Sequence, residues 1–256
     1  MKSYIIHLVR HGMTEGNKTG QYVGSMDVDI TTEGINQLKE LKEKYDYGNP
    51  QVIYRSPLKR CKQTTDILYD NADTVVVEGL RECNFGDFEG KTSEELVDDP
   101  RFNDWVRHGA TPPNGESNKE FAERICIAFI NTIKEILKSG VKETAICAHG
   151  GVIMTLLSVY GLPEQEMINW MANNGRGFTI RVTPSIWMRT GMVEVIGEYP
   201  PGSYDEPDLS RNPVKELNNN EDSNPFGTGE EEYDSYEDTE YFWADVEEKE
   251  NSEDKE

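Results

Sequence analysis

Short apolar runs rich in β-branched residues alternate with longer amphipathic stretches over the first two hundred residues. Six of these runs have the length and composition of strands: Tyr4–Val9, Gln51–Tyr54, Thr74–Glu78, Thr144–Ala148, Phe178–Val182 and Met192–Glu198. The runs YIIHLV and TAICA are apolar on both faces, as expected for strands that are covered on both sides. The sequence therefore predicts an α/β fold, a three-layer sandwich with a mostly parallel central sheet and helices on both faces.

The helices expected between these strands carry start and stop signals. They are predicted over Thr32–Tyr45, Ser56–Tyr69, Ser117–Lys138 and Gly151–Tyr160. In the second of them, Ser56 would cap the helix and Pro57 would occupy its first turn. In the third, Ser117 and Glu120 have the spacing of a capping box. The fourth helix follows directly on the fourth strand and stops before Gly161.

Charge divides the chain into two parts. The whole sequence has 48 acidic and 26 basic residues, a formal net charge of −22. Residues 201–256 hold 20 of the acids but only 4 of the bases, whereas residues 1–200 have an ordinary balance. Acidic segments with few aliphatic residues are typical of disordered chains. We expect one globular domain over residues 1–200 and an acidic, disordered tail over residues 201–256, whose aromatic residues could dock a protein partner.

The same composition argues against several classes of protein. No apolar run approaches the roughly 20 residues that a membrane helix needs, and the apolar start is too short for a signal peptide. The negative charge disfavours nucleic acid as a partner. Four cysteines, Cys61, Cys83, Cys126 and Cys147, show no metal-ligand spacing. We expect reduced thiols, no metal or cofactor, and a cytoplasmic protein.

Chemically capable residues follow several of the predicted strands. Arg10 and His11 come directly after the first strand, and the helix after the second carries Arg60. Glu82 follows the third strand, and His149 follows the fourth at the start of a helix. Ligands of such sheets bind beyond the carboxyl ends of the strands. We therefore expect two histidines, two arginines and a carboxylate to converge on one crevice.

This set of residues suits phosphoryl chemistry. The planar fork of arginine matches phosphate oxygens, and a helix N-terminus adds N–H donors for an anion. An unprotonated imidazole nitrogen can attack phosphorus, while the cationic groups stabilise the charge that develops.

Four segments in this order resemble branch 1 of the histidine phosphatase superfamily, the phosphoglycerate mutase-like enzymes. They are RHGxTxxN from Arg10, SPLKRCKQT from Ser56, LRECNFGDFEG from Leu80 and CAHGG from Cys147. RHG alone would be weak, but four ordered motifs are specific. The resemblance spans about residues 3–200, which would form the catalytic domain, and has no counterpart for the tail. In motif spacing the chain is most similar to the α-ribazole phosphatases and broad-specificity phosphatases.

The resemblance implies roles for individual residues. His11 would be the nucleophile that becomes phosphohistidine, with Arg10 and Arg60 binding the phosphate. His149 would contact the phosphoryl group, and Glu82 would donate a proton to the leaving oxygen. Four further residues would line the substrate pocket: Thr14, Asn17, Gly24 and Gly150.

Two ambiguities remain in the sequence. Asp87 and Glu89 are neighbouring carboxylates that could assist or replace Glu82. The tripeptide RHG also recurs at residues 107–109, but no apolar strand precedes this copy and the downstream asparagine is missing. We therefore assign the nucleophile to His11 rather than His108.

The predicted function is hydrolysis of a small phosphorylated metabolite by a metal-independent phosphomonoesterase. The alternative within the same family is a 2,3-bisphosphoglycerate-dependent phosphoglycerate mutase. The short interval between Glu82 and His149, with few basic residues before its long helix, favours water over re-transfer of the phosphoryl group. A non-catalytic binding module, with the tail as its working part, would need a damaged motif, and none is damaged.

Overall fold

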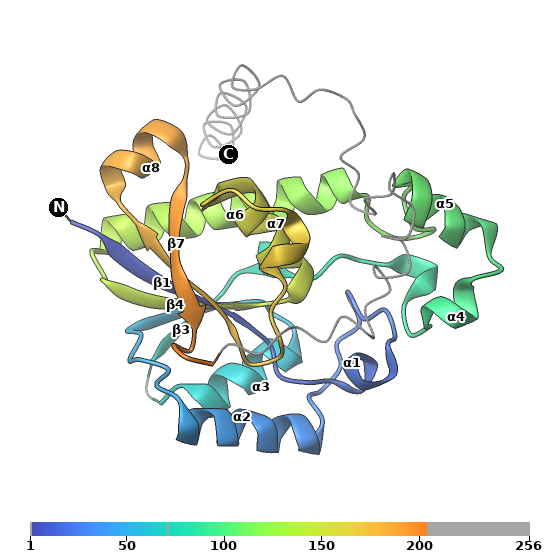
Figure 1. Ribbon diagram of the computed structural model, residues 1–256, viewed down its shortest axis with the longest axis horizontal. Coiled ribbons are helices and arrows are strands. Elements are labelled where there is room, and N and C mark those ends of the chain that lie inside the picture. Colours follow the sequence, from blue (N-terminus) through green and yellow to red (C-terminus); the bar gives the residue numbers. More distant parts are fainter. Residues whose placement is uncertain (1, 71, 204–256) are drawn as a thin grey trace, which may run out of the picture.

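The computed structural model describes residues 2–70 and 72–203, which form three layers (Figure 1). Helices α2 (Thr32–Lys44) and α3 (Lys59–Leu68) cover one face of a central sheet. Helices α6 (Asn118–Ser139) and α7 (Gly150–Tyr160) cover the other face. The predicted three-layer α/β sandwich is confirmed.

The central sheet has seven strands within the described residues, in the order β3-β2-β4-β1-β6-β7-β5. Their bounds are β1 Tyr4–Arg10, β2 Val52–Arg55, β3 Asp73–Val76, β4 Glu143–Ala148, β5 Gly161–Leu162, β6 Gly177–Val182 and β7 Val193–Tyr199. The pairs β1–β4, β2–β4, β2–β3 and β5–β7 are parallel, whereas β6 is antiparallel to both β1 and β7. The predicted mostly parallel sheet is therefore confirmed, with β6 as its antiparallel member.

Strand β1 lies at the centre of the sheet and is covered on both sides. Its residues Ile6 and Leu8 pack into the core beneath α6 and α7. Val9 points the other way and joins Leu38 of α2 and Cys61 of α3. Both sets are fully buried, which explains why the strand is apolar on both faces.

The predicted start of the second helix is wrong. Helix α3 begins at Lys59, with Leu58 at its cap position and no side-chain cap. Ser56 and Pro57 therefore precede the helix, and the Ser56 hydroxyl bonds to His149 at 2.8 Å and accepts from the Leu58 N–H at 3.4 Å. By contrast, the predicted capping box of Ser117 and Glu120 is present at the start of α6. The strand boundaries differ from the predicted ones by one or two residues.

A smaller group of helices stands beside the three layers, at the end of the sheet toward which β1 runs, on the right in Figure 1. It contains α1 (Glu15–Thr19), α4 (Ser93–Leu96) and α5 (Pro100–His108). Its own apolar cluster is largely aromatic and includes Tyr22, Phe88, Leu96, Phe102, Trp105 and Val106. Helix α8 (Pro184–Thr190) lies between β6 and β7 in the sequence. The aromatic cluster gives the loops around the end of β1 a rigid support.

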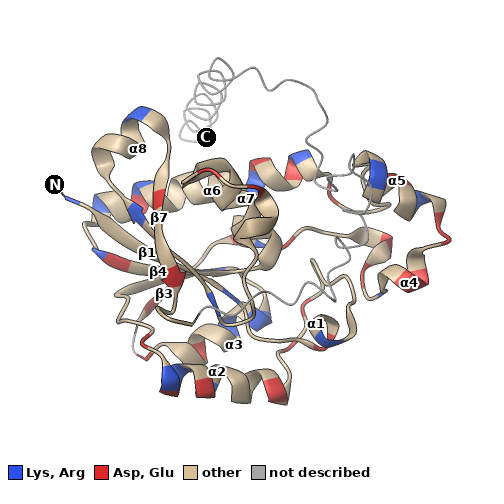
Figure 2. Ribbon diagram, viewed as in Figure 1, with Lys and Arg blue, Asp and Glu red and all other residues tan. Residues whose placement is uncertain are grey.

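Other sequence predictions have mixed outcomes. All four cysteines lie in the described part of the chain, and they are buried and free. Within residues 2–70 and 72–203, no helix is long and apolar enough to cross a bilayer. Along α2, acidic and basic residues are interspersed (Figure 2), as on a helix face that meets solvent. The last strand ends at Tyr199, and the predicted disordered tail falls almost entirely on residues 204–256, outside the described residues.

Candidate active site

His11 sits immediately after the central strand β1. Its backbone N–H donates to the Ala148 carbonyl, 3.0 Å away, which ties it to the end of β4. The imidazole is only 5% exposed. Its Nδ1 lies 2.8 Å from the Gly12 carbonyl oxygen, and because a carbonyl only accepts, Nδ1 carries the proton. The lone pair of the neutral ring is therefore on Nε2, the ring atom that could act as a nucleophile.

His149 lies beside His11, at the end of β4 and the cap position of α7. The two ring centroids are 5.2 Å apart, a separation that one phosphoryl group can bridge. The Arg60 Nε–H donates to His149 Nδ1 over 3.1 Å, and His149 Nε2 is 2.8 Å from Ser56 Oγ. Since Nδ1 accepts, Nε2 carries the proton and donates to the hydroxyl. Both ring nitrogens thus bond to protein, and contact of His149 with a phosphoryl group stays a prediction.

The two arginines converge on the same histidines. Arg60 is fully buried on the first turn of α3. Besides its bond to His149, it donates to the carbonyls of Met26 and Gly24, at 2.8 and 2.7 Å. A guanidinium has five N–H donors, so these three contacts leave two for an anion.

Arg10 donates through Nη1 to the Ala172 carbonyl, 2.8 Å away. Its Nε is buried and has no hydrogen-bond partner among the described residues. A buried, unpaired guanidinium N–H is costly, and a bound anion would satisfy it. The charge and planar geometry of this group fit a phosphate oxygen.

Glu82 approaches the same place from the loop after β3. Its carboxylate accepts from the backbone N–H of Gly151 in the first turn of α7, at 3.0 Å, and from that of Cys83, at 3.1 Å. A Cβ on Gly151 would lie 2.5 Å from the Glu82 carboxyl oxygen, so only glycine permits this approach. The carboxyl group is thus held over the N-terminus of α7.

Burial gives these groups shifted proton affinities. Burial, followed by the charges of Arg60 and Arg10, holds the pKa of His11 well below 6.5. Burial and Arg60 lower the pKa of His149 in the same way. Burial raises the pKa of Glu82, although its two backbone hydrogen bonds and the arginines oppose the shift. The site therefore favours a neutral His11 imidazole and a Glu82 carboxyl group that keeps its proton above its usual pH range.

The four predicted pocket residues lie around this centre. Thr14 caps α1 and forms a capping box with Asn17. The carbonyl of Gly24 holds Arg60. Gly150 opens α7 beside Arg10, since a Cβ there would lie 3.5 Å from the guanidinium carbon. Their contacts to a substrate stay predictions.

The two alternative carboxylates have other partners. Asp87 accepts from the Asn114 amide at 2.9 Å and pairs with Arg101 at 3.5 Å. Glu89 binds the backbone of residues 25 and 26. Both are thereby occupied in holding loops, which leaves Glu82 as the carboxylate at the start of α7.

The second RHG copy, at residues 107–109, has a different structural setting. Arg107 and His108 are exposed in the last turn of α5, and Gly109 ends that helix in the left-handed conformation, with φ of 64°. A basic last turn followed by glycine is a common helix ending. Helix termination alone therefore accounts for this copy.

Three contributors to the site were not predicted as such. Ser56 seemed to be a helix cap, but its hydroxyl bonds to His149. The Thr64 hydroxyl accepts from the Gly12 N–H at 2.7 Å. The Asn174 amide donates to the His11 carbonyl at 2.8 Å and to Asn17 at 3.3 Å. Thr64 at least lies inside a recognised motif, whereas Asn174 follows no sequence signal and reaches His11 only through the fold.

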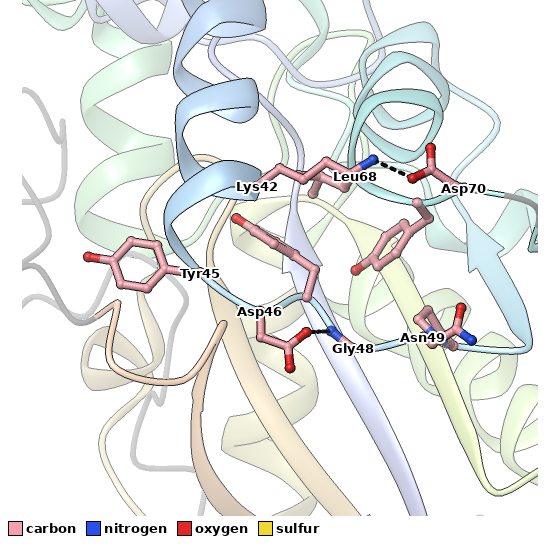
Figure 3. A pocket seen from close by; sticks show the side chains of 10 residues that line it. Lys42, Tyr45, Asp46, Gly48, Asn49, Leu68 and Asp70 are labelled. Carbon is pink, nitrogen blue, oxygen red and sulfur yellow. Dashed lines mark hydrogen bonds and ion pairs between the residues drawn. The ribbon is translucent and has the colours of Figure 1, made fainter.

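A separate hollow of about 200 Å³ lies between the C-terminal ends of α2 and α3 (Figure 3). Its lining includes Lys42 and Asp70, which form an ion pair, and Asp46, which accepts from the Gly48 N–H. It is at the end of the sheet where the strands begin, and its lining includes none of the predicted site residues. Within the described residues, no cluster of three or more His, Cys, Asp or Glu side chains could hold a metal ion.

Comparison with known proteins places this site in a family. The chain is 32% identical over 166 residues to a putative phosphoserine phosphatase 2 of Hydrogenobacter thermophilus, covering 61% of this chain and 80% of that one. It is 30% identical over 201 residues to a 2,3-bisphosphoglycerate-dependent phosphoglycerate mutase of Bifidobacterium longum, covering 64% and 80%.

Among solved structures, a putative α-ribazole-5′-P phosphatase of Escherichia coli matches with a TM-score of 0.65 at 20% identity, covering 77% of this chain and 96% of that one. At that identity the match supports the fold. In sequence, residues 6–188 match the histidine phosphatase superfamily, branch 1. Because this match covers most of the chain and every residue gathered at the end of β1, the protein belongs to branch 1 of the histidine phosphatase superfamily.

Proposed function

We propose that this protein is a metal-independent phosphomonoesterase that hydrolyses a small phosphorylated metabolite through a phosphohistidine on His11. The observation that carries the proposal is the state of the His11 ring. Its Nδ1–H is held by the Gly12 carbonyl, its pKa is lowered, and a buried, unpaired Arg10 N–H lies beside it. This arrangement presents a neutral nitrogen beside a guanidinium group whose charge and planar geometry suit a phosphate oxygen.

In the first step, the Nε2 lone pair of His11 attacks phosphorus and the bond to the ester oxygen breaks. The protonated Glu82 gives its proton to the departing oxygen, so the product leaves as an alcohol. The phosphorylated ring gains positive character, which the Gly12 carbonyl stabilises through Nδ1–H. Arg10, Arg60 and the N–H groups at the start of α7 stabilise the transferring phosphoryl oxygens.

In the second step, water attacks the phosphorus of the phosphohistidine. The Glu82 carboxylate left by the first step accepts a proton from this water. The N–P bond breaks, inorganic phosphate departs, and Nε2 regains its lone pair. The enzyme returns to its starting protonation state.

The alternative is a phosphoglycerate mutase, which 30% identity to a relative of that name favours. A mutase returns the phosphoryl group to a second substrate oxygen instead of to water. It must therefore hold that substrate while the phosphohistidine persists. Between Glu82 and the start of α6 the only lysines and arginines are Lys91, Arg101 and Arg107. Lys91 already donates to the Asp87 carbonyl, and Arg101 is already paired with Asp99. This favours hydrolysis.

A screen of phosphorylated metabolites tests the proposal. It includes phosphoserine, α-ribazole 5′-phosphate and 3-phosphoglycerate, each with and without 2,3-bisphosphoglycerate, and measures both released phosphate and isomerised product. We expect phosphate release from at least one monoester, independent of the bisphosphate and undiminished by a metal chelator. Isomerisation that depends on the bisphosphate, with little phosphate release, would establish the mutase instead.

A further inference from the structure

Glu89 makes an unusual number of contacts with a single short loop. Its Oε1 accepts from the backbone N–H and the hydroxyl of Ser25, both at 2.7 Å, and its Oε2 accepts from the Met26 N–H at 2.8 Å. Oε1 also accepts from the Phe85 N–H at 3.2 Å. One carboxylate thus joins residues 25 and 26 to the segment that follows Glu82. Hydrogen bonds to an ionised acceptor are stronger than neutral ones.

The loop that Glu89 holds is the one that holds Arg60. The carbonyls of Gly24 and Met26, on either side of Ser25, accept hydrogen bonds from the two terminal nitrogens of the Arg60 guanidinium. Ser25 and Met26 are themselves exposed, so burial does little to fix them. Gly24 packs so closely on the Cys83 carbonyl that a Cβ there would lie 1.7 Å from the oxygen. The loop is therefore fixed at Gly24 by packing and at residues 25 and 26 by Glu89.

We infer that Glu89 is a positioning residue for the reaction, acting through the 24–26 loop to aim the Arg60 guanidinium at the phosphoryl group. This rests on the proposed function, since the phosphoryl group is the anion that Arg60 would hold. The positions of the Gly24 and Met26 carbonyls determine which N–H groups of the Arg60 guanidinium are left to donate to an anion. If those carbonyls move, the two remaining donors rotate with the guanidinium plane.

The contacts also separate this role from that of an acid. The hydrogen bonds of Glu89 go to residues 25, 26 and 85, whereas Glu82 bonds to the first turn of α7, next to His149. A donor to the leaving group needs a proton, and burial raises the pKa of Glu82 so that it keeps one above its usual range. Loss of Glu89 should therefore weaken phosphate binding for every substrate, whatever the leaving group.

The test substitutes Glu89→Gln, with Asp87→Asn as its matched control. Glutamine keeps the size and one acceptor oxygen but turns an amide N–H toward the Met26 N–H. Asp87→Asn removes the same charge two residues away, where the carboxylate contacts Asn114 and Arg101. The measurements are kcat/KM for p-nitrophenyl phosphate and for an alkyl phosphate, and the affinity for inorganic phosphate by calorimetry.

We expect Glu89→Gln to lower kcat/KM about 10- to 100-fold on both substrates, the size of effect that a small misplacement causes. Phosphate affinity should fall in parallel, and the control should change each value less than threefold. In an Arg60→Ala background, Glu89→Gln should then add less than threefold, because the two residues act as one unit. Thermal melting of each variant shows that it is folded.

Three outcomes would overturn the inference: Glu89→Gln behaving like its control, losses that multiply in the Arg60→Ala background, or a loss confined to the alkyl phosphate. These outcomes are distinct from failure of the proposed function, in which the wild-type protein releases no phosphate. Phosphate affinity needs no turnover, so its change on Glu89→Gln still decides the inference in that case.

Discussion

The tripeptide Arg-His-Gly occurs twice in this chain and has a different structural origin in each place. At residues 10–12 it ends the central strand, with the histidine 5% exposed. At residues 107–109 it ends helix α5 with the histidine exposed. Even the glycines differ. A Cβ on Gly12 would lie 2.7 Å from a Leu38 methyl group, whereas a Cβ on Gly109 would make only an ordinary contact with Asn118, at 3.7 Å, but the φ of Gly109 is 64°.

The difference shows that the tripeptide itself carries little information. Parallel strands gather whatever follows them at one edge of the sheet, and β1 lies between β4 and β6. His11 therefore meets His149 from the neighbouring strand end. At the end of α5, by contrast, Arg107 and His108 are exposed to solvent. The lowered pKa of His11 and the lone pair on its Nε2 come from its tertiary contacts and not from the tripeptide sequence.

Removal of the His11 imidazole tests directly which of the two RHG copies holds the nucleophile. His11→Ala should lower phosphomonoester hydrolysis more than about a thousand-fold, because removal of a nucleophile abolishes the covalent route. Acid-labile labelling of the protein by a ³²P-phosphomonoester should vanish with it. Steady-state rates and the acid lability of the label measure the two effects.

The matched variant is His108→Ala. It should retain activity within about twofold and label normally, since an exposed residue away from special features has small effects. Labelling that survives in His11→Ala but disappears in His108→Ala would mean that the second copy is the nucleophile.

A smaller loss of activity is expected from Glu82→Gln, which tests the carboxyl group beside the first RHG copy. Glu82→Gln removes the proton donor, so hydrolysis of an alkyl phosphate should fall about 10²- to 10⁴-fold, the usual contribution of acid catalysis. Nitrophenolate leaves without a proton, and p-nitrophenyl phosphate should lose only a few-fold. Equal losses on both substrates would contradict the assignment of Glu82 as the acid.

The pH dependence follows from the directions of the two pKa shifts. Because the pKa of Glu82 is raised, its acid form persists above 4.5, and alkyl phosphate hydrolysis falls only as pH rises through that raised value. Because the pKa of His11 is held well below 6.5, the neutral nucleophile survives acidification, and the rise on the acid side lies well below 6.5. A rate profile of kcat/KM should show both limbs, and Glu82→Gln should lose the descending one.

Gly109 of the second RHG copy should affect only the stability of the protein. Gly109→Ala forces a left-handed conformation on alanine and should lower the free energy of unfolding by about 1 kcal/mol. Turnover should be unchanged, because the helix end only terminates α5. Urea denaturation measures the first effect and the rate assay the second. A large loss of activity with normal stability would show that this copy belongs to the site after all.

Sequence patterns predicted the four longest helices and six of the seven strands of the described residues, because elements buried in the core leave unambiguous apolar runs. They gave neither the short strand β5 nor the shorter helices α1, α4, α5 and α8. They failed at the start of α3, where Ser56 and Pro57 suggest a cap and a first turn. Those signals are local, whereas the Ser56 hydroxyl has a partner 93 residues away. Asn174 was missed for the same reason, since its bond to His11 spans 163 residues.

By itself, the sequence determined the layered fold and placed His11, Arg60, Glu82 and His149 at strand ends that must meet, because periodicity and strand order are properties of the chain. Only the tertiary structure decided which nitrogen of His11 carries the lone pair, and that His149 bonds both to Ser56 and to Arg60. It also decided that Glu89 binds a loop while Glu82 faces α7. Hydrogen-bond partners depend on separations of a few tenths of an ångström between distant segments, and no local pattern of residues encodes them.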